Sequence, residues 1–305
     1  MRQLYLAATG MNRGKTTVAL GLLDALMERG LRTGFIKPVG QRYDVVDGVP
    51  ADEDAILMRS VFGLPDPYGS MSPVHIPRGF TKAFIRGEVV EDLPAKIIAA
   101  HARVSEGRDV VVVEGTGHAG VGAVIGLSNA DVAALLGTPV LIVSEAGVGR
   151  PIDEIVLNHA LFRRHGVEVV GAVVNKVDLE AHPSLEEVLR LGLARHGIEL
   201  LGVLPYRPVL SNPTVTMLQE QMAGEELAPG LDPARVIEHV AIGAMQPRHV
   251  LERIGPGSLL IVPGDREDVI DAVVAAEREA RRPDAHPPTR WSGLHRGRPP
   301  VRFGR

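Results

Sequence analysis

The stretch ATGMNRGKTT, residues 8–17, decides the fold, because it ends in the Gly-Lys-Thr triplet of a phosphate-binding loop. In such a loop, backbone N–H groups and the N-terminus of the following helix surround a phosphate. The lysine reaches the β- and γ-phosphates, and the next hydroxyl binds Mg²⁺. Lys15 and Thr16 take these two places. The usual pattern also has a glycine five residues before the triplet begins, but here that residue is Thr9 and Gly10 follows one place later.

The residues on either side of the loop have the pattern of a strand and a helix. QLYLAA precedes the loop as a short apolar run, and apolar residues follow it at helical spacing as far as Gly30, a natural stop. A strand, a glycine loop and a helix in this order are the context that a phosphate-binding loop requires. We therefore predict a nucleotide site that includes nine consecutive residues: Thr9, Gly10, Met11, Asn12, Arg13, Gly14, Lys15, Thr16 and Thr17.

The composition excludes several classes of protein. The chain has 305 residues and is 45% hydrophobic, which is enough for one large core or two smaller ones. It has no cysteine, so disulfides, thiolate catalysis and cysteine metal sites are excluded. The net charge of −4 gives no reason to expect a nucleic acid as partner. With no signal peptide and no apolar run long enough to span a bilayer, we expect a cytoplasmic protein without a membrane partner.

Short apolar runs alternate with amphipathic helical stretches over most of the chain. The runs lack the polar alternation of half-exposed strands, which is typical of strands covered on both faces. The pattern predicts a doubly wound α/β domain with a mostly parallel sheet over residues 1–214. The expected strands are residues 4–9, 33–39, 109–115, 139–145, 167–175 and 198–205, and the expected helices are 16–29, 53–62, 93–106, 130–136, 152–165 and 184–196.

A second, smaller unit follows. Strand, helix, strand and helix patterns succeed one another over residues 215–277, which predicts a small α/β module near the lower size limit for independent folding. Residues 278–305 are rich in Arg, Pro and Gly and have almost no aliphatic side chains. We expect this segment to be a disordered tail.

Charged residues lie at the ends of two of the expected strands. Ligands of doubly wound sheets bind beyond the carboxyl ends of the strands, and Lys37 and Glu114 lie at the C-terminal ends of the second and third expected strands. Lys37 is either a surface lysine or a cation that neutralises a polyphosphate or an anionic substrate. Glu114 is placed like the acidic Mg²⁺ partner of Thr16, and Gly115 after it lets the backbone approach a phosphate.

Two further motifs leave alternatives open. Asp52-Glu53-Asp54 supplies either a carboxylate that caps the following helix or one that holds Mg²⁺ or its water shell. Asn175-Lys176-Val177-Asp178 matches the base-reading loop of many GTPases, although Asn175 alone serves adenine equally well. The alternative is a turn after a strand, since Asn and Asp favour turns. Pro205 ends a strand at the same edge and is a candidate wall for the base.

Taken together, the motifs resemble a known family. TGMNRGKTTVALGL, KPVG, DEDA, VVEGTG and NKV occur in the order and spacing of dethiobiotin synthetase-like P-loop proteins. The set is most similar to the synthetase-like N-terminal domain of phosphate acetyltransferases. IGAM followed by PGSLLIVPGDREDVI resembles the start of a DRTGG domain, a regulatory module. The resemblance covers residues 2–276 and implies a P-loop NTPase sheet, with ATP and Mg²⁺ as cofactors.

The resemblance assigns roles to individual residues. It implies Thr16, Asp54 and Glu114 at the metal. It implies Lys15 at the phosphates and Lys37 at the γ-phosphate or at an anionic substrate, so these two lysines are the candidate catalytic residues. It makes Asn175 the base contact, which favours ATP over GTP. The relatives also lack the standard first glycine.

Three functional readings follow. The first is an ATP-binding regulatory or sensor protein that acts on a partner through its second domain. The second is an ATP-dependent ligase that activates a carboxylate or carbamate of a small anionic substrate. The third is a GTPase-like switch. Dethiobiotin synthetases have a serine soon after K-P-V and the sequence E-G-A-G-G, where this chain has GQR and EGTGH, and this counts against the second reading. The absence of an acetyltransferase domain argues against acetyl transfer, and we expect a homodimer.

Overall fold

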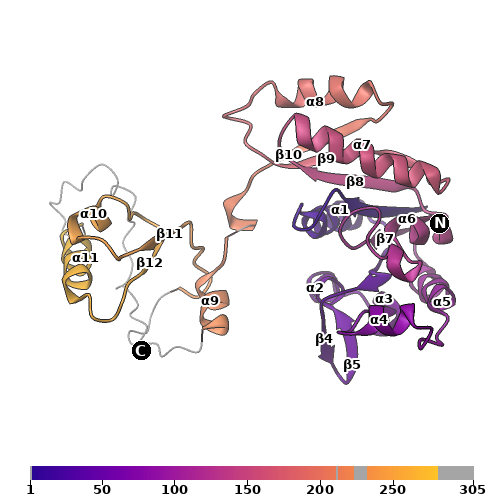
Figure 1. Cartoon of the computed structure of the whole chain (residues 1–305), viewed down its shortest axis with the longest axis horizontal. Helices are drawn as coiled ribbons and strands as arrows, with labels where there is room; N and C mark the ends of the chain where they lie inside the picture. The colour runs from indigo at the N-terminus through magenta and orange to yellow at the C-terminus, as the bar shows by residue number, and fades with distance from the viewer. Residues whose placement is uncertain (1, 211, 223–231, 281–305) are drawn as a thin grey trace. The chain divides into compact units, whose positions relative to one another are not determined.

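The structure is a computed structural model that describes residues 2–210, 212–222 and 232–280 (Figure 1). The chain divides into two compact units, and the boundary in the sequence lies between Tyr206 and Arg207. The domain limits expected from the sequence, 1–214 and 215–277, remain predictions. No helix in the described part of the chain is long and apolar enough to cross a membrane.

A six-stranded parallel sheet forms the centre of the first unit. Its strand order is β10-β9-β8-β1-β7-β2, with every neighbouring pair parallel. The predicted parallel α/β class is thus confirmed. The strands are β1 (Arg2–Ala8), β2 (Thr33–Ile36), β7 (Val110–Glu114), β8 (Val140–Glu145), β9 (Val169–Val177) and β10 (Leu200–Pro205).

Helices cover the sheet on both faces, and each face has its own hydrophobic core. Side chains alternate along a strand, so Tyr5 and Ala7 of β1 face one core and Leu6 faces the other. Buried residues on the Tyr5 side come from α5 (Leu93–Ser105), α6 (Asn129–Leu136), α7 (Gly149–Arg164) and α8 (Leu185–Ala194). Those on the Leu6 side come from α1 (Lys15–Glu28), α2 (Glu53–Phe62) and α3 (Tyr68–Met71). Burial on both faces explains why the strands are continuous apolar runs.

Several short elements lie between β2 and α5. The strands β4 (Tyr43–Val46) and β5 (Val49–Asp52) pair in antiparallel fashion, and the two residues between them, Asp47 and Gly48, both have positive φ. This is the conformation that a two-residue Asp-Gly hairpin turn requires. The hairpin leads directly into α2. The other short elements are β3 (Val39–Gly40), β6 (Val74–His75) and α4 (Phe80–Ile85), with single turns at Ala123–Ile125 and, after β10, at Pro208–Leu210.

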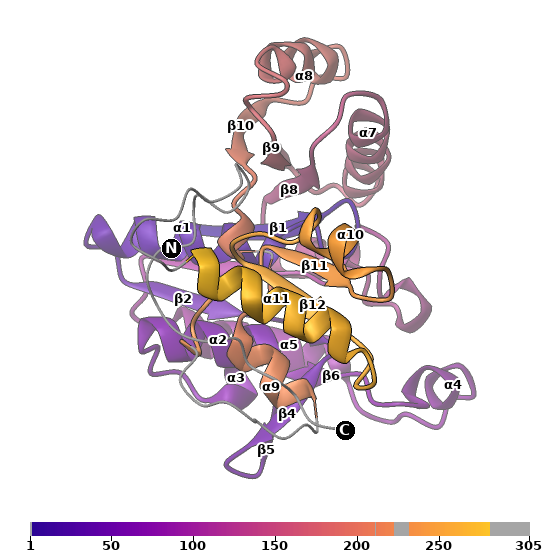
Figure 2. The ribbon, with the colours of Figure 1, turned by 90° about the vertical axis from the view of Figure 1, so that its left-hand side faces the viewer.

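The second unit has a separate small core. The strands β11 (His239–Ile242) and β12 (Ser258–Ile261) are parallel, and α10 (Pro247–Leu251) lies between them in the sequence. Figure 2 shows α11 (Glu267–Ala280) lying along these strands, where Val269 packs with Val250 and Ile254. A further helix, α9 (Val215–Gln221), precedes them. Because α11 extends to Ala280, residues 278–280 are helical rather than part of the expected tail, and the rest of that tail lies outside the described residues.

Candidate functional site

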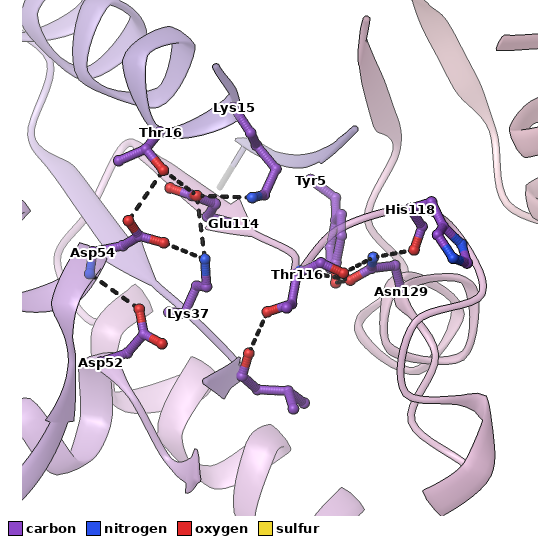
Figure 3. A network of polar contacts seen from close by, with 11 residues as sticks. Tyr5, Lys15, Thr16, Lys37, Asp52, Asp54, Glu114, Thr116, His118 and Asn129 are labelled. Atoms are coloured by element: carbon purple, nitrogen blue, oxygen red, sulfur yellow. Dashed lines mark hydrogen bonds and ion pairs between the residues drawn. The ribbon is translucent and has the colours of Figure 1, made fainter. Parts of the chain in front are cut away.

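Three neighbouring strands bring the charged residues to one edge of the sheet. β1, β7 and β2 are parallel and adjacent, so their carboxyl ends lie together. β1 leads into the phosphate loop and α1, β2 leads to Lys37, and β7 ends at Glu114. Figure 3 shows that these two residues face Lys15, Thr16 and Asp54. The five residues form one cluster although they are far apart in the sequence.

Glu114 is at the centre of this cluster and is completely buried. Its Oε1 accepts a hydrogen bond from the Thr16 hydroxyl at 2.9 Å and lies 3.2 Å from Nζ of both Lys15 and Lys37. Its second oxygen, Oε2, is buried without a hydrogen-bond partner among the described residues. Because a buried carboxylate oxygen without a partner is costly, this atom is of the kind that a metal ion or its water shell satisfies.

Asp54 closes the cluster from the first turn of α2. Its Oδ1 accepts a hydrogen bond from the Thr16 hydroxyl at 3.0 Å, and its Oδ2 pairs with the ammonium of Lys37. The cap of α2 is Asp52, whose side chain accepts a hydrogen bond from the backbone N–H of Asp54 at 3.0 Å. Because Asp52 caps the helix, the carboxylate of Asp54 is available to the cluster.

Burial and charge pairing compete in setting the pKa values of the cluster. Burial lowers the pKa of Lys37, but the nearby carboxylates outweigh burial and raise it overall. At Lys15 burial prevails over the attraction of Glu114 and lowers the pKa. Burial raises the pKa of Asp52 to about 6. Burial acts in the same direction on Asp54, but the Lys37 ammonium outweighs it and lowers the pKa of that carboxyl.

The donor set of the cluster fits Mg²⁺. This ion prefers oxygen ligands and is usually bound by one or two carboxylates, with substrate phosphates and water completing the shell. Glu114, Asp54 and Thr16 supply two carboxylates and one hydroxyl, and among the described residues Oε2 of Glu114 has no hydrogen-bond partner. The described residues contain no group of three His, Asp or Glu side chains suited to a metal, so a metal ion here would depend on phosphate and water.

The phosphate loop turns without a glycine at position nine. The residues with positive φ are Asn12, at 58°, and Gly14, at 85°, whereas Thr9 has an ordinary backbone conformation. Gly14 is the N-cap residue of α1, and no side chain caps this end of the helix. The first turn of α1 has no acidic residue. The N-terminus of α1 is therefore suited to an anion. Met11 is exposed, and Thr17 is half-buried in α1.

The candidate base-binding residues lie beside the same loop. The Nδ2 atom of Asn175 donates a hydrogen bond to the carbonyl of Arg13 at 3.2 Å, and Lys176 donates one to the carbonyl of Asn12 at 2.7 Å. Pro205 ends β10, which is the neighbour of β9. The side chain of Arg13 points away from the charged cluster, toward Glu145 and Glu154.

A second network, which the sequence analysis missed, shapes the segment after β7. Asn129, at the start of α6, accepts hydrogen bonds from the Tyr5 hydroxyl at 2.8 Å and from the backbone N–H of Thr116 at 3.0 Å (Figure 3). Its amide donates to the carbonyls of Thr116 and His118. A Cβ at Gly115 would lie 2.4 Å from Oδ1 of Asn129, so packing alone requires this glycine. No motif in the sequence indicates this pairing.

Known proteins resemble this chain in both units. Residues 2–214 match the family described as AAA domain, and residues 217–282 match the DRTGG domain. The phosphate acetyltransferase of Pseudomonas aeruginosa is 27% identical over 293 residues, which make up 90% of this chain and 40% of that protein. The chain thus spans about 40% of the length of the phosphate acetyltransferases that it matches.

Two further proteins are similar to about two thirds of the chain. The ATP-dependent dethiobiotin synthetase of Anaeromyxobacter dehalogenans is 32% identical over 213 residues, which make up 68% of this chain and 92% of the synthetase. Among solved structures, a chain of the MinC:MinD cell division protein complex of Aquifex aeolicus aligns with 69% of this chain. The alignment covers 84% of the solved chain, with a TM-score of 0.44 and 15% identity. From the family matches and the synthetase alignment, the chain belongs to the dethiobiotin synthetase-like family of P-loop AAA domains, here combined with a DRTGG domain.

Proposed function

We propose that the first unit binds ATP together with Mg²⁺, and that the DRTGG unit makes the protein a regulator or sensor of that nucleotide. The observation that carries the proposal is the cluster of Lys15, Thr16, Lys37, Asp54 and Glu114 at the carboxyl edge of the sheet. In related P-loop sites these residue types hold phosphates and a metal ion. The DRTGG match over residues 217–282 supports the regulatory part.

The charges of the cluster support joint binding of nucleotide and metal. Without nucleotide, the ammonium groups of Lys15 and Lys37 both lie on Glu114. When Lys15 turns to a phosphate, the buried carboxylate loses part of its compensation. A divalent cation held by Glu114 and Asp54 would replace that charge. We therefore expect tight nucleotide binding to require Mg²⁺.

The orientation of Asn175 supports ATP rather than GTP. One N–H of its Nδ2 group donates to the Arg13 carbonyl, and in this orientation its Oδ1 atom can accept a hydrogen bond from a base. Adenine presents an amino group at the position where guanine presents a carbonyl, so this acceptor favours adenine. Asp178, the last residue of the GTPase-like motif, instead accepts a hydrogen bond from the backbone N–H of Ala181 at 2.9 Å, as a turn residue does.

Calorimetry tests the proposal. Titration of Mg·ATP, Mg·GTP and ATP with EDTA into the wild-type protein should give binding of Mg·ATP that is tighter than binding of the other two. Lys15→Ala should weaken the binding of Mg·ATP strongly, and Asp178→Ala should leave the ATP preference intact. Equal affinity in the wild type and Lys15→Ala would exclude this nucleotide site, and a GTP preference that Asp178→Ala removes would point to the GTPase-like switch.

A second candidate function is ATP-dependent ligation. The 32% identity to a dethiobiotin synthetase favours it, as does Lys37, which lies where it could stabilise charge on a transferred phosphoryl group. In this reaction a substrate carboxylate or carbamate oxygen attacks the γ-phosphorus and displaces ADP. A second nucleophile of the substrate then attacks the activated carbonyl and releases phosphate. Incubation with diaminopelargonate, bicarbonate and ATP, followed by product analysis, distinguishes the two functions. Dethiobiotin and ADP would establish the ligase, and bound ATP without product would favour the regulatory role.

A further inference from the structure

The side chain of Arg13 does not face the phosphate site, although the residue lies in the phosphate loop. Its guanidinium pairs with Glu145, at the end of β8, and its Nη2 atom lies 3.5 Å from Oε2 of Glu154 on α7. The side chain is only 13% exposed. A largely buried arginine between two carboxylates is a stronger contact than an exposed ion pair. It ties the loop to two elements on the β8 side of β1.

The two departures from the usual loop sequence lie beside this contact. Thr9 stands where the pattern has glycine, and its hydroxyl bonds at 3.1 Å to the hydroxyl of Ser144, the residue before Glu145 in β8. At Gly10, an added Cβ would lie 3.3 Å from Nε of Arg13, which is closer than ordinary contact. The absence of a side chain at residue 10 therefore leaves room for the guanidinium. The position of the glycine and the direction of the arginine are structurally linked.

Glu154 is the residue on which these contacts converge. Its carboxylate lies 3.5 Å from Nη2 of Arg13 and accepts a hydrogen bond from Nε of Arg150 at 2.6 Å. Burial raises the pKa of Glu154, but the Arg150, Thr9 and Arg13 side chains outweigh burial and hold the pKa below its usual value. The carboxylate is therefore ionised at neutral pH and available to Arg13. Arg150 is exposed and contacts the same carboxylate without touching the loop, so it offers a matched control.

We propose that Arg13 is a positioning residue: with Glu145 and Glu154 it forms a latch that holds the phosphate loop in its binding conformation before nucleotide arrives. This inference rests on the proposed function and adds how that site is kept ready. Holding the loop in advance lowers the ordering cost of binding. The latch therefore contributes to the binding of the phosphates, which the loop surrounds, and not to the binding of the base.

Calorimetry with Mg·ADP and with adenosine separates these two contributions. Arg13→Gln and Glu154→Gln should each weaken Mg·ADP binding by about tenfold or more, the scale of one charged hydrogen bond. The double variant should be no weaker than the weaker single variant, because both changes break the same contact. Arg13→Lys should recover part of the affinity. Adenosine binding should be unchanged in all of them, and Arg150→Gln should bind Mg·ADP like the wild type.

If Arg13 had a different role, Glu154→Gln would change the affinity for Mg·ADP in the opposite direction. If Arg13 were a phosphate ligand that the carboxylates merely hold back, removing the charge of Glu154 would free it and tighten Mg·ADP binding. That result would overturn the latch. Additive losses in the double variant, or equal losses with adenosine, would also overturn it.

Hydrogen exchange tests the latch without any nucleotide. In the free protein, amides of residues 10–16 should exchange about tenfold faster or more in Arg13→Gln than in the wild type or in Arg150→Gln, because the loop opens more often. Unchanged exchange would exclude the latch even if the variants bound nucleotide more weakly than the wild type. If the wild type bound no nucleotide but this difference appeared, the proposed function would fail and the latch would stand. Melting temperatures of all variants show that they are folded.

Discussion

At the scale of the residue, the two oxygens of Glu114 differ in a way that bears on two roles that the sequence presents as alternatives. A carboxylate at the end of a buried strand either supports the fold or binds a metal. Here Oε1 pairs with two lysines, whereas Oε2 is buried and has no hydrogen-bond partner among the described residues. Removing the charge of Glu114 should therefore change the stability of the nucleotide-free protein as well as the stabilisation expected from a bound metal ion.

We predict that Glu114→Gln lowers the free energy of unfolding of the nucleotide-free protein by about 3 kcal/mol, since it leaves buried ammonium groups without their main partner. The same variant should lose the extra stabilisation that Mg²⁺ gives in the presence of ATP. Urea unfolding with and without Mg·ATP measures both effects. As a control, Asp109→Asn, which breaks the exposed pair with Arg32, should have a much smaller effect. Unchanged stability of Glu114→Gln would mean that the lysines do not depend on this residue.

Asp52 should make the stability depend on pH. Its pKa in the folded protein is about 6, above the 3.8 of an unperturbed carboxyl. The folded state therefore binds the proton more tightly than the unfolded state, so this residue stabilises the protein as the pH falls from about 7 to 4. The difference of roughly two pH units corresponds to at most about 3 kcal/mol.

The variant Asp52→Asn isolates this effect, because asparagine is an equally good helix cap and carries no proton. The stability difference between wild type and variant should change in favour of the wild type as the pH is lowered from 7 to 4. Urea unfolding of both proteins at several pH values measures it. Parallel pH profiles would show that Asp52 has an ordinary pKa in the folded protein.

At the scale of the element, the sequence predicts best what is long and repetitive. The six central strands and their helices follow from continuous apolar runs and helical spacing. The short elements do not: α3 has four residues and α4 has six, too few to show a helical period. The hairpin β4–β5 has its Asp-Gly turn in the sequence, but its strands are only four residues long and half exposed.

The residues of the candidate site also differ in whether the sequence could predict that they lie together. Lys37 and Glu114 could be placed together because parallel strands gather their carboxyl ends at one edge. Asn129, Glu145 and Glu154 could not be linked to the site, because their contacts depend on which loops and helices meet in space. The hydrogen bond from Tyr5 to Asn129 joins residues 124 positions apart. No local pattern contains that information.

Asn129, at the start of α6, supports the segment after β7. We predict that substitutions in its hydrogen-bond network lower the free energy of unfolding more when they remove more bonds. Asn129→Ala removes the partners of the Thr116 N–H, of two carbonyls and of the Tyr5 hydroxyl, and should cost about 2–4 kcal/mol. Tyr5→Phe removes one of these bonds and should cost about 1 kcal/mol. Thermal and urea unfolding measure both. Equal costs would mean that the segment after β7 does not depend on Asn129.

At the scale of the whole molecule, the two units have separate cores. The core clusters on the two faces of the large sheet contain no residue beyond Val203, and the cluster of the second unit contains none before Ala241. All candidate phosphate, metal and base contacts lie before Arg207. A domain with its own core can in general fold alone, and about 200 residues are ample for this.

We therefore predict that a chain ending at Tyr206 folds and binds Mg·ATP with an affinity within about twofold of the full chain, because no proposed ligand is removed. Calorimetry of both chains measures the affinities, and a melting curve shows whether the shorter chain is folded. Lys15→Ala in the shorter chain serves as control and should weaken binding as it does in the full chain. A folded shorter chain with clearly weaker binding would show that the second unit contributes to the nucleotide site, and would connect the DRTGG domain directly with the nucleotide that we propose it senses.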